Sequence, residues 1–175
     1  MALSPAGFWD IMAEEASAES ELWASALVPG PERDLVAVFS PLADDRFALG
    51  LETIYEGYLL HYGSARLFEP ADRDTAVLLG DYLYAHGLVR IAEHGDVDVV
   101  ADLAELLSTC AFLRAEGRSG DGVVWASALA LLGEWRRAFV LASSEEVWHE
   151  LAVRAAGREP VERALALHAD RIAAR

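Results

Sequence analysis

The feature that most constrains this fold is a run of three helical patterns between residues 44 and 117. In the first, from 44 to 68, apolar and aromatic side chains recur at steps of three and four residues, which is the period of an amphipathic helix. The second runs from about 72 to 93, and the third from a capping residue, Asp96, to about 116. Short loops join the three, so we expect them to pack antiparallel.

The rest of the chain also carries helical rather than strand patterns. Alanine and leucine dominate and valines are scattered, which favours helices. A length of 175 residues suffices for one core and is short for two domains. We therefore predict an all-α fold in a single domain, residues 1–175, built as an antiparallel bundle of about 7–8 helices. The further helices are expected over 5–27, 33–39, 122–139, from a Ser143–Glu146 capping box onward, and over 160–173.

The charge of the chain is strongly acidic and unevenly distributed. The formal net charge is −15, and residues 1 to 56 carry 11 acids against 2 arginines. A nucleic-acid-binding protein needs a basic stripe, which this sequence lacks, so we expect no nucleic-acid partner. Acidity of this kind more often serves solubility, but the acidic first third could instead face a basic partner.

Several residue types also restrict chemistry and location. All 14 basic residues are arginine, so the chain has neither a Schiff-base lysine nor a phosphate-loop lysine. The single cysteine, Cys110, occupies an apolar helical position and is predicted to be a core residue in a reducing compartment. The longest uncharged stretch, 122–133, has 12 residues, which is too short to span a membrane. The N-terminus lacks a secretory pattern, so we expect a cytoplasmic protein.

Two glutamates in the first helical pattern are the main candidates for metal chemistry. Glu52 and Glu56 lie four residues apart and therefore share a helix face, and His61 follows. We favour the interpretation that they belong to a solvated or capping face, with metal binding as the alternative. The five histidines are dispersed without metal-ligand spacing, so we predict no metal or cofactor held by this chain alone.

Gly80 and Asp81 interrupt the second helical pattern, in the stretch TAVLLGDYLYAHGL. A glycine in mid-helix costs about 1 kcal/mol and so needs a structural or functional reason. We favour a close approach of a neighbouring helix at Gly80, with Asp81 hydrogen-bonding across that contact. The alternative is a ligand role in which Asp81 and His86 turn towards one pocket.

Three consecutive segments resemble motifs of a known family. LETIYEGYLLHYG (51–63) is similar to a helix of the form E-L-I-H-x-x-x-L-L-H-D-D, AVLLGDYLYAHGLVRIAEHGD (76–96) to one containing A-V-L-x-G-D-Y-L-x-A, and VVADLAELLSTCAFLRAEG (99–117) to the acid-, alanine- and leucine-rich helix that follows. These are motifs of the trans-polyprenyl diphosphate synthases, with GDYL the most specific. The resemblance implies an isoprenoid-synthase-like bundle with its family-like core at 44–117 and C-terminal helices at 122–173.

The departures from that family concern its metal ligands. Where the family carries D-D-x-x-D, this chain reads Tyr62-Gly63-Ser64-Ala65-Arg66, and VWHEL (147–151) does not replace the second aspartate-rich motif. Magnesium-assisted ionisation of a diphosphate requires several oxygen ligands on facing helices. The resemblance therefore implies a non-catalytic small or regulatory subunit, or a degenerate relative, of a heteromeric polyprenyl diphosphate synthase. Such a chain would shape the prenyl-chain pocket of a catalytic partner, and only that partner would hold magnesium.

Two other functions stay open on the sequence. One is a stand-alone helical protein, a homodimer, that binds an apolar ligand or a regulatory partner. The other is an autonomous prenyltransferase that requires magnesium. Partner contact or self-association is expected to use the helices at 47–67 and 75–94. The residues expected to line a pocket or a partner contact are Tyr55, Tyr58, Leu59, His61, Tyr62, Arg66, Gly80, Asp81, Tyr82 and His86.

Overall fold

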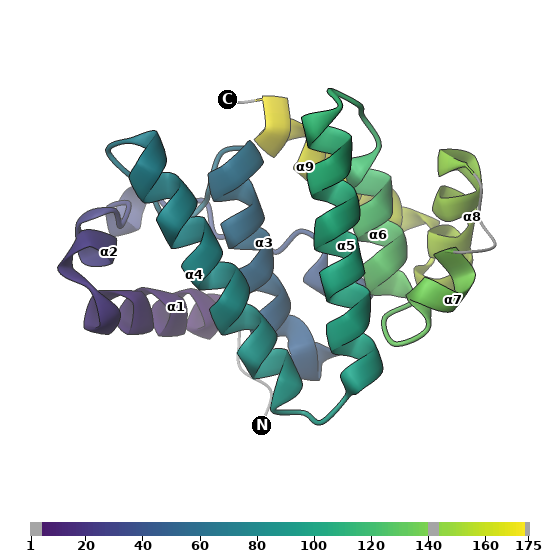
Figure 1. Cartoon of the computed structure of the whole chain (residues 1–175), viewed down its shortest axis with the longest axis horizontal. Coiled ribbons are helices and arrows are strands. Elements are labelled where there is room, and N and C mark those ends of the chain that lie inside the picture. The colour runs from purple at the N-terminus through teal and green to yellow at the C-terminus, as the bar shows by residue number, and fades with distance from the viewer. Residues whose placement is uncertain (1–4, 140–143, 174–175) are drawn as a thin grey trace.

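A computed structural model describes residues 5–139 and 144–173, and within those ranges the fold is all-α (Figure 1). The only pairing of extended backbone there is an isolated bridge between Leu27 and Phe68. Three short 3-10 turns, η1 (Gly30–Glu32), η2 (Ser40–Leu42) and η3 (Asp45–Phe47), precede the central helix. The α-helices are α1 (Pro5–Glu19), α2 (Glu21–Ser25), α3 (Ala48–Tyr62), α4 (Arg73–Ala92), α5 (Val97–Ala115), α6 (Asp121–Ala130), α7 (Trp135–Phe139), α8 (Glu145–Ala156) and α9 (Arg158–Ala173).

The central element is α3, which lies behind α4 in Figure 1. Every residue from Gly50 to Leu60 is buried. The prediction of an amphipathic helix was therefore wrong for this segment, because other elements surround it on all sides. The periodic spacing was real, but the positions between the apolar residues carry glycines and glutamates that are buried as well.

Glycines on both helices allow α3 and α4 to pack closely in an antiparallel pair. A Cβ at Gly57 would lie 2.8 Å from the carbonyl oxygen of Gly80, and a Cβ at Gly87 would lie 2.8 Å from the carbonyl oxygen of Gly50. The two glycines of each helix are seven residues apart, so both face the same side of their helix. The prediction that Gly80 marks a close helix contact is confirmed.

Helices α4 and α5 begin where the sequence predicts. The Asp72 carboxylate accepts a hydrogen bond of 2.7 Å from the backbone N–H of Thr75, and the Asp96 carboxylate accepts one of 3.2 Å from that of Val99. Both acids are N-caps, which satisfy backbone donors that the first turn leaves free.

Two helices predicted near the N-terminus differ from the structure: one is broken into two helices, and the other does not form. The helix expected over 5–27 breaks at Ser20, whose hydroxyl accepts a hydrogen bond of 3.1 Å from the N–H of Leu22 and so caps α2. The segment 33–39 is not helical but runs in an extended path between η1 and η2. Tertiary contacts decide this conformation, since the carbonyl oxygen of Val36 accepts a hydrogen bond from the buried Arg66 side chain.

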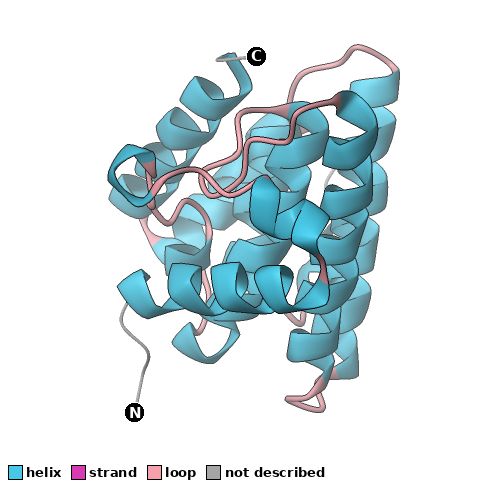
Figure 2. Cartoon of the chain, turned by 90° about the vertical axis from the view of Figure 1, so that its left-hand side faces the viewer, coloured by secondary structure: helices cyan, strands magenta, loops and turns pink. Residues whose placement is uncertain are grey.

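The helix expected to reach Phe68 ends at Tyr62, because the following loop pairs with residues 26–28. The backbone N–H of Val28 donates to the carbonyl oxygen of Leu67 at 3.0 Å, and that of Glu69 donates to Ala26 at 2.7 Å. Figure 2, which faces the side of α1 and α2, shows these loop segments crossing the molecule next to one another above α1.

The C-terminal part contains more helices than expected. The segment 122–139 divides into α6 and α7, because the buried Asp102 carboxylate of α5 binds the backbone N–H groups of Gly133 and Trp135 and so starts a new helix. Helix α8 begins after Ser144, and the proposed capping residue Ser143 lies outside the described residues. Within the described ranges, every helix is too short or too polar to cross a bilayer.

Candidate functional site

Most of the predicted site residues lie on or next to α3, but they form several small groups rather than one pocket. Tyr55, Tyr58 and Leu59 are completely buried in the core. His61 and Tyr62 are half-buried at the end of α3, and on α4 Gly80 is buried, Asp81 is exposed, and Tyr82 and His86 are half-buried. Arg66 follows α3 and is buried as well.

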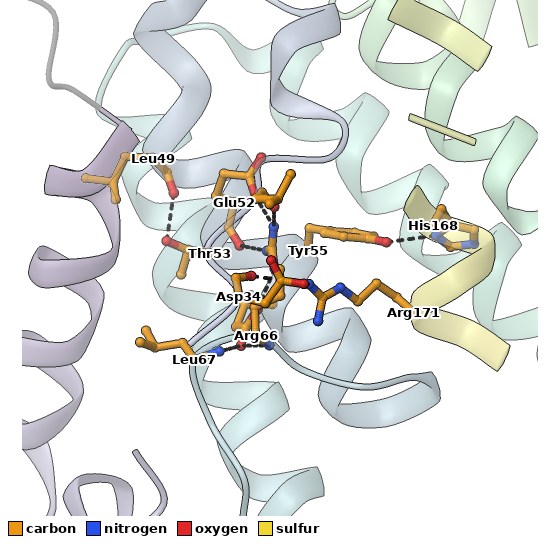
Figure 3. Close-up of polar contacts among 11 residues, drawn as sticks. Asp34, Leu49, Glu52, Thr53, Tyr55, Arg66, Leu67, His168 and Arg171 are labelled. Carbon is orange, nitrogen blue, oxygen red and sulfur yellow. Dashed lines mark hydrogen bonds and ion pairs between the residues drawn. The ribbon is translucent and has the colours of Figure 1, made fainter. Parts of the chain in front are cut away.

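Arg66 and the two glutamates of α3 form a buried ion cluster (Figure 3). The Arg66 Nη1 donates to Glu52 Oε2 at 2.6 Å, and its Nε donates to Glu56 Oε2 at 2.9 Å. The other oxygen of Glu56 accepts hydrogen bonds from the backbone N–H groups of Arg66 and Leu67, at 2.8 and 2.7 Å. All three charged side chains are at most 1% exposed. The cluster therefore ties the loop after α3 back onto the helix.

This cluster corrects the interpretation of Glu52 and Glu56 as a solvated or capping face. Their carboxylates are held by Arg66, which also lies over the ring of Trp9 at 4.4 Å from its centroid. Burial alone would lower the pKa of Arg66, but the neighbouring carboxylates of Glu52 and Glu56 outweigh burial and raise it. The guanidinium consequently stays charged and bound to both acids.

A second buried network joins α3 to α6 and α9. The Asp121 Oδ2 accepts hydrogen bonds from Tyr58 Oη at 2.5 Å and from the Arg114 guanidinium, and it lies 3.0 Å from His168 Nε2. The other ring nitrogen of His168 lies 2.9 Å from Tyr55 Oη. With Nε2 protonated and Nδ1 accepting from the tyrosine, a neutral imidazole satisfies both contacts.

Burial and hydrogen bonding shift the pKa values of the aspartate and the two tyrosines in this second network. Burial would raise the pKa of Asp121, but hydrogen bonds from His168, Tyr58 and Arg114 lower it well below its usual range. Burial raises the pKa values of Tyr55 and Tyr58 far above that of a free phenol. Tyrosine, histidine and aspartate in a row resemble a proton relay, but each of these residues is at most 5% exposed, so the arrangement fastens helices together instead of meeting a substrate.

Asp81 and His86 do not turn towards one pocket. The Asp81 Oδ1 lies 3.2 Å from Nε2 of His61, so this acid bridges α4 to the end of α3 as the sequence predicts. His86 instead stacks on Tyr82, with ring centroids 5.1 Å apart, and its Nδ1 lies 3.7 Å from the carboxylate of Glu15.

A cleft of about 490 Å³ lies beside the loop that follows α3. Its wall includes residues 63–66, then Val28, Glu32 and Asp34 of the loop before α3, and Arg171 of α9. Both arginines on the wall are engaged: Arg66 holds the two glutamates, and Arg171 pairs with the carboxylate of Asp34. Among the described residues, this cleft offers an anionic diphosphate no unoccupied guanidinium, while Glu32 and Glu69 would repel it.

The described residues also lack an assembled metal centre, since no three His, Cys, Asp or Glu side chains come together in a group that could hold an ion. A Glu-x-x-His spacing does occur from Glu146 to His149 on α8, and His149 pairs there with Glu162 at 3.0 Å. Cys110 is completely buried, as predicted, and burial raises the pKa of its thiol, so it does not serve as a nucleophile.

Sequence reasoning missed four residues of the two buried networks, Trp9, Arg114, Asp121 and His168, and it also missed Arg171, which pairs with Asp34 at the cleft. Asp121 and His168 are 47 residues apart, and no local pattern connects them. The Glu52–Glu56 pair did carry a signal, because two acids in a helix that is otherwise apolar all round require a buried cation.

Comparisons with family models, curated proteins and solved structures each return no match to this chain.

Proposed function

We propose that this chain is a non-catalytic, small-subunit-like relative of a heteromeric polyprenyl diphosphate synthase, which binds a catalytic subunit through the outer face of α4. The catalytic partner holds magnesium and the diphosphate, and this chain shapes the prenyl-chain pocket from outside. Support comes from the sequence resemblance over residues 50–117 and from the α4 surface described next.

The observation that carries the proposal is an apolar ridge along the outer face of α4. Leu78 and Val89 are 57% and 58% exposed, which is high for large aliphatic side chains. Ala85 is exposed between them, and Tyr82 lies on the flank of the same face. Positions 78, 82, 85 and 89 follow the spacing of three and four residues that one helix uses to contact another.

The burial of α3 supports α4 as the contact element in this proposal. The sequence led us to expect contacts through both helices, but α3 is enclosed within the described chain. The glycine contacts with α3 fix α4 in place, so its outer ridge is a rigid surface whose ordering costs little on binding.

The proposal is tested by co-expressing the chain with an intact aspartate-rich synthase encoded beside it, followed by size-exclusion chromatography and product analysis. We expect one co-eluting complex and a changed prenyl-chain length. Leu78→Glu and Val89→Glu should each abolish co-elution, because they place a charge in the apolar contact. Val147→Glu on α8 is the matched control, since Val147 is 42% exposed on another helix and should be neutral.

Separate elution with unchanged product length would refute the synthase-subunit role. If the chain instead elutes as a homodimer that Leu78→Glu dissociates, the ridge serves self-association, and the stand-alone protein becomes the better interpretation. Magnesium-dependent turnover of an allylic diphosphate by the purified chain alone would contradict both.

A further inference from the structure

The α4 ridge continues onto α2 as a patch that contains two aromatic side chains. We call Trp23, Leu78 and Tyr82 the α2–α4 patch; Leu22 precedes Trp23 on α2. The ring centroids of Trp23 and Tyr82 lie 5.9 Å apart, and this contact joins the two helices, which are neighbours in Figure 1. Leu78 precedes Tyr82 by one helical turn, and Leu22 is 47% exposed. Tryptophan and tyrosine with exposed leucines are the composition of a binding hot spot.

The charged residues around this patch are mostly acidic. Glu19 and Glu21 flank it on the side of α1 and α2, and Asp74 and Asp81 flank it on α4; all four are exposed. Burial raises the pKa of Tyr82, and the nearby charge of Glu19 raises it further, which places that acid at the edge of the patch.

Two basic side chains near this rim already have an acidic partner, whereas Arg73, exposed at the start of α4, directly precedes the rim acid Asp74. Arg90 and His86, both on α4, face the carboxylate of Glu15 on α1. The rim thus carries four exposed acids, of which Asp81 lies beside His61, against one exposed arginine, within a chain whose net charge is −15.

This charge pattern distinguishes between possible occupants. A second copy of the chain would bring another acidic rim against the first, and like charges across an interface are costly. An anionic membrane surface is repelled for the same reason. A helix with leucine-type residues on one face and arginine or lysine on its flanks would instead match both the apolar centre and the acidic rim.

We infer that the α2–α4 patch binds an amphipathic helix of a partner protein that is apolar along one face and basic along its flanks. This inference rests on the proposed function in that it identifies the chemistry of the partner at the same ridge. The acids at 19, 21, 74 and 81 speed the encounter and select the partner, whereas the apolar side chains hold it.

The test uses peptides instead of the synthase, so that its outcome is independent of the synthase-subunit role. Two fluorescent helical peptides of about 18 residues carry the same leucine stripe, one with lysine and arginine flanks and the other with glutamate flanks. Binding to the full chain is measured by fluorescence anisotropy. We expect only the basic peptide to bind, with a Kd that rises about tenfold or more between about 50 and 500 mM NaCl.

Three variants locate the site. Leu78→Glu should abolish binding of the basic peptide, with folding checked by circular dichroism. The double variant Glu19→Gln/Glu21→Gln should weaken binding about threefold or more relative to Glu105→Gln/Glu116→Gln, which makes the same charge change at an exposed position of α5 and at its C-cap.

Equal binding of the two peptides, or binding of neither, would overturn the inference, as would a preference for uncharged lipid vesicles over the basic peptide. Peptide binding without a synthase complex would refute the synthase role while leaving the patch chemistry intact. A synthase complex that forms equally well with Glu19→Gln/Glu21→Gln would support the synthase role and refute the proposed patch chemistry.

Discussion

The buried ion cluster allows a sharp prediction, because its two glutamates depend on Arg66 to different degrees. In Arg66→Met the side chain keeps its approximate volume but loses four hydrogen bonds, to Glu52, Glu56 and the carbonyl oxygens of Glu52 and Val36. Removing one partner of a buried ion pair costs about 3–5 kcal/mol, because the remaining charge is left buried without compensation. That is a large share of the about 5–15 kcal/mol by which a domain of this kind is stable.

The two acids differ in what remains after the substitution. Glu56 keeps the backbone N–H groups of Arg66 and Leu67 as donors. Glu52 loses the guanidinium that binds its Oε2, and its Oε1 has no hydrogen-bond partner among the described residues to begin with. Most of the penalty therefore falls on Glu52, so Glu52→Gln should restore more stability to Arg66→Met than Glu56→Gln does.

The assay is urea unfolding followed by circular dichroism, on the unsubstituted chain, on Arg66→Met and on the two double variants Arg66→Met/Glu52→Gln and Arg66→Met/Glu56→Gln. Arg154→Met is the control, since Arg154 and Glu150 form an exposed pair on α8 that is worth roughly 0.5 kcal/mol or less. The reasoning fails if Arg66→Met costs no more than this control, or if Glu56→Gln is the better rescue.

Three further predictions concern packing, reactivity and acid stability. Gly57→Ala should destabilise the fold by about 1–3 kcal/mol in urea titrations, because its Cβ would lie 2.8 Å from a backbone carbonyl oxygen of α4, whereas Gly30→Ala meets nothing within 4 Å and should be neutral. The Cys110 thiol, with its raised pKa, should react with a thiol reagent only after unfolding, and rapid labelling of the native chain would contradict its burial. The pKa of Asp121 is lowered by folding, so its contribution is complete above the unfolded value of about 3.9 and is lost as the pH falls below that value. In Asp121→Asn the urea midpoint should therefore fall less steeply between pH 5 and the acid limit than it does in the unsubstituted chain. An unchanged slope would show that other carboxylates control acid unfolding.

The parts of the fold that sequence predicts well are those that local signals specify. Helices α4 and α5 have an aspartate cap at the start, a long apolar period and a defined end, and their bounds match the prediction within about a residue. The extended path of 33–39 could not be predicted in this way, since it depends on a hydrogen bond from Arg66, 30 residues away. Tertiary contacts there override the local preference for helix.

The candidate site was harder to predict because its residues come from distant parts of the chain. Periodicity identified α3 as a helix but could not distinguish one exposed face from complete burial. It therefore assigned Glu52 and Glu56 to solvent, although they lie in the core beside Arg66. Gly80 was predictable because a mid-helix glycine has few physical explanations, and close packing is the commonest of them.

The arrangement of α3 also bears on where function can lie. At 100° per residue, Glu52 and Glu56 define one face, Tyr55 and Tyr58 a second, and the interhelical glycine Gly57 a third, each separated by roughly a third of a turn. The first face holds the loop through Arg66, the second holds α6 and α9 through Asp121 and His168, and the third receives α4. A substrate could reach α3 only by displacing a buried charge, a hydrogen-bonded tyrosine or a neighbouring helix, each at a cost of several kcal/mol. The outer ridge of α4 requires no such displacement, which is why we place the function of this chain on that surface.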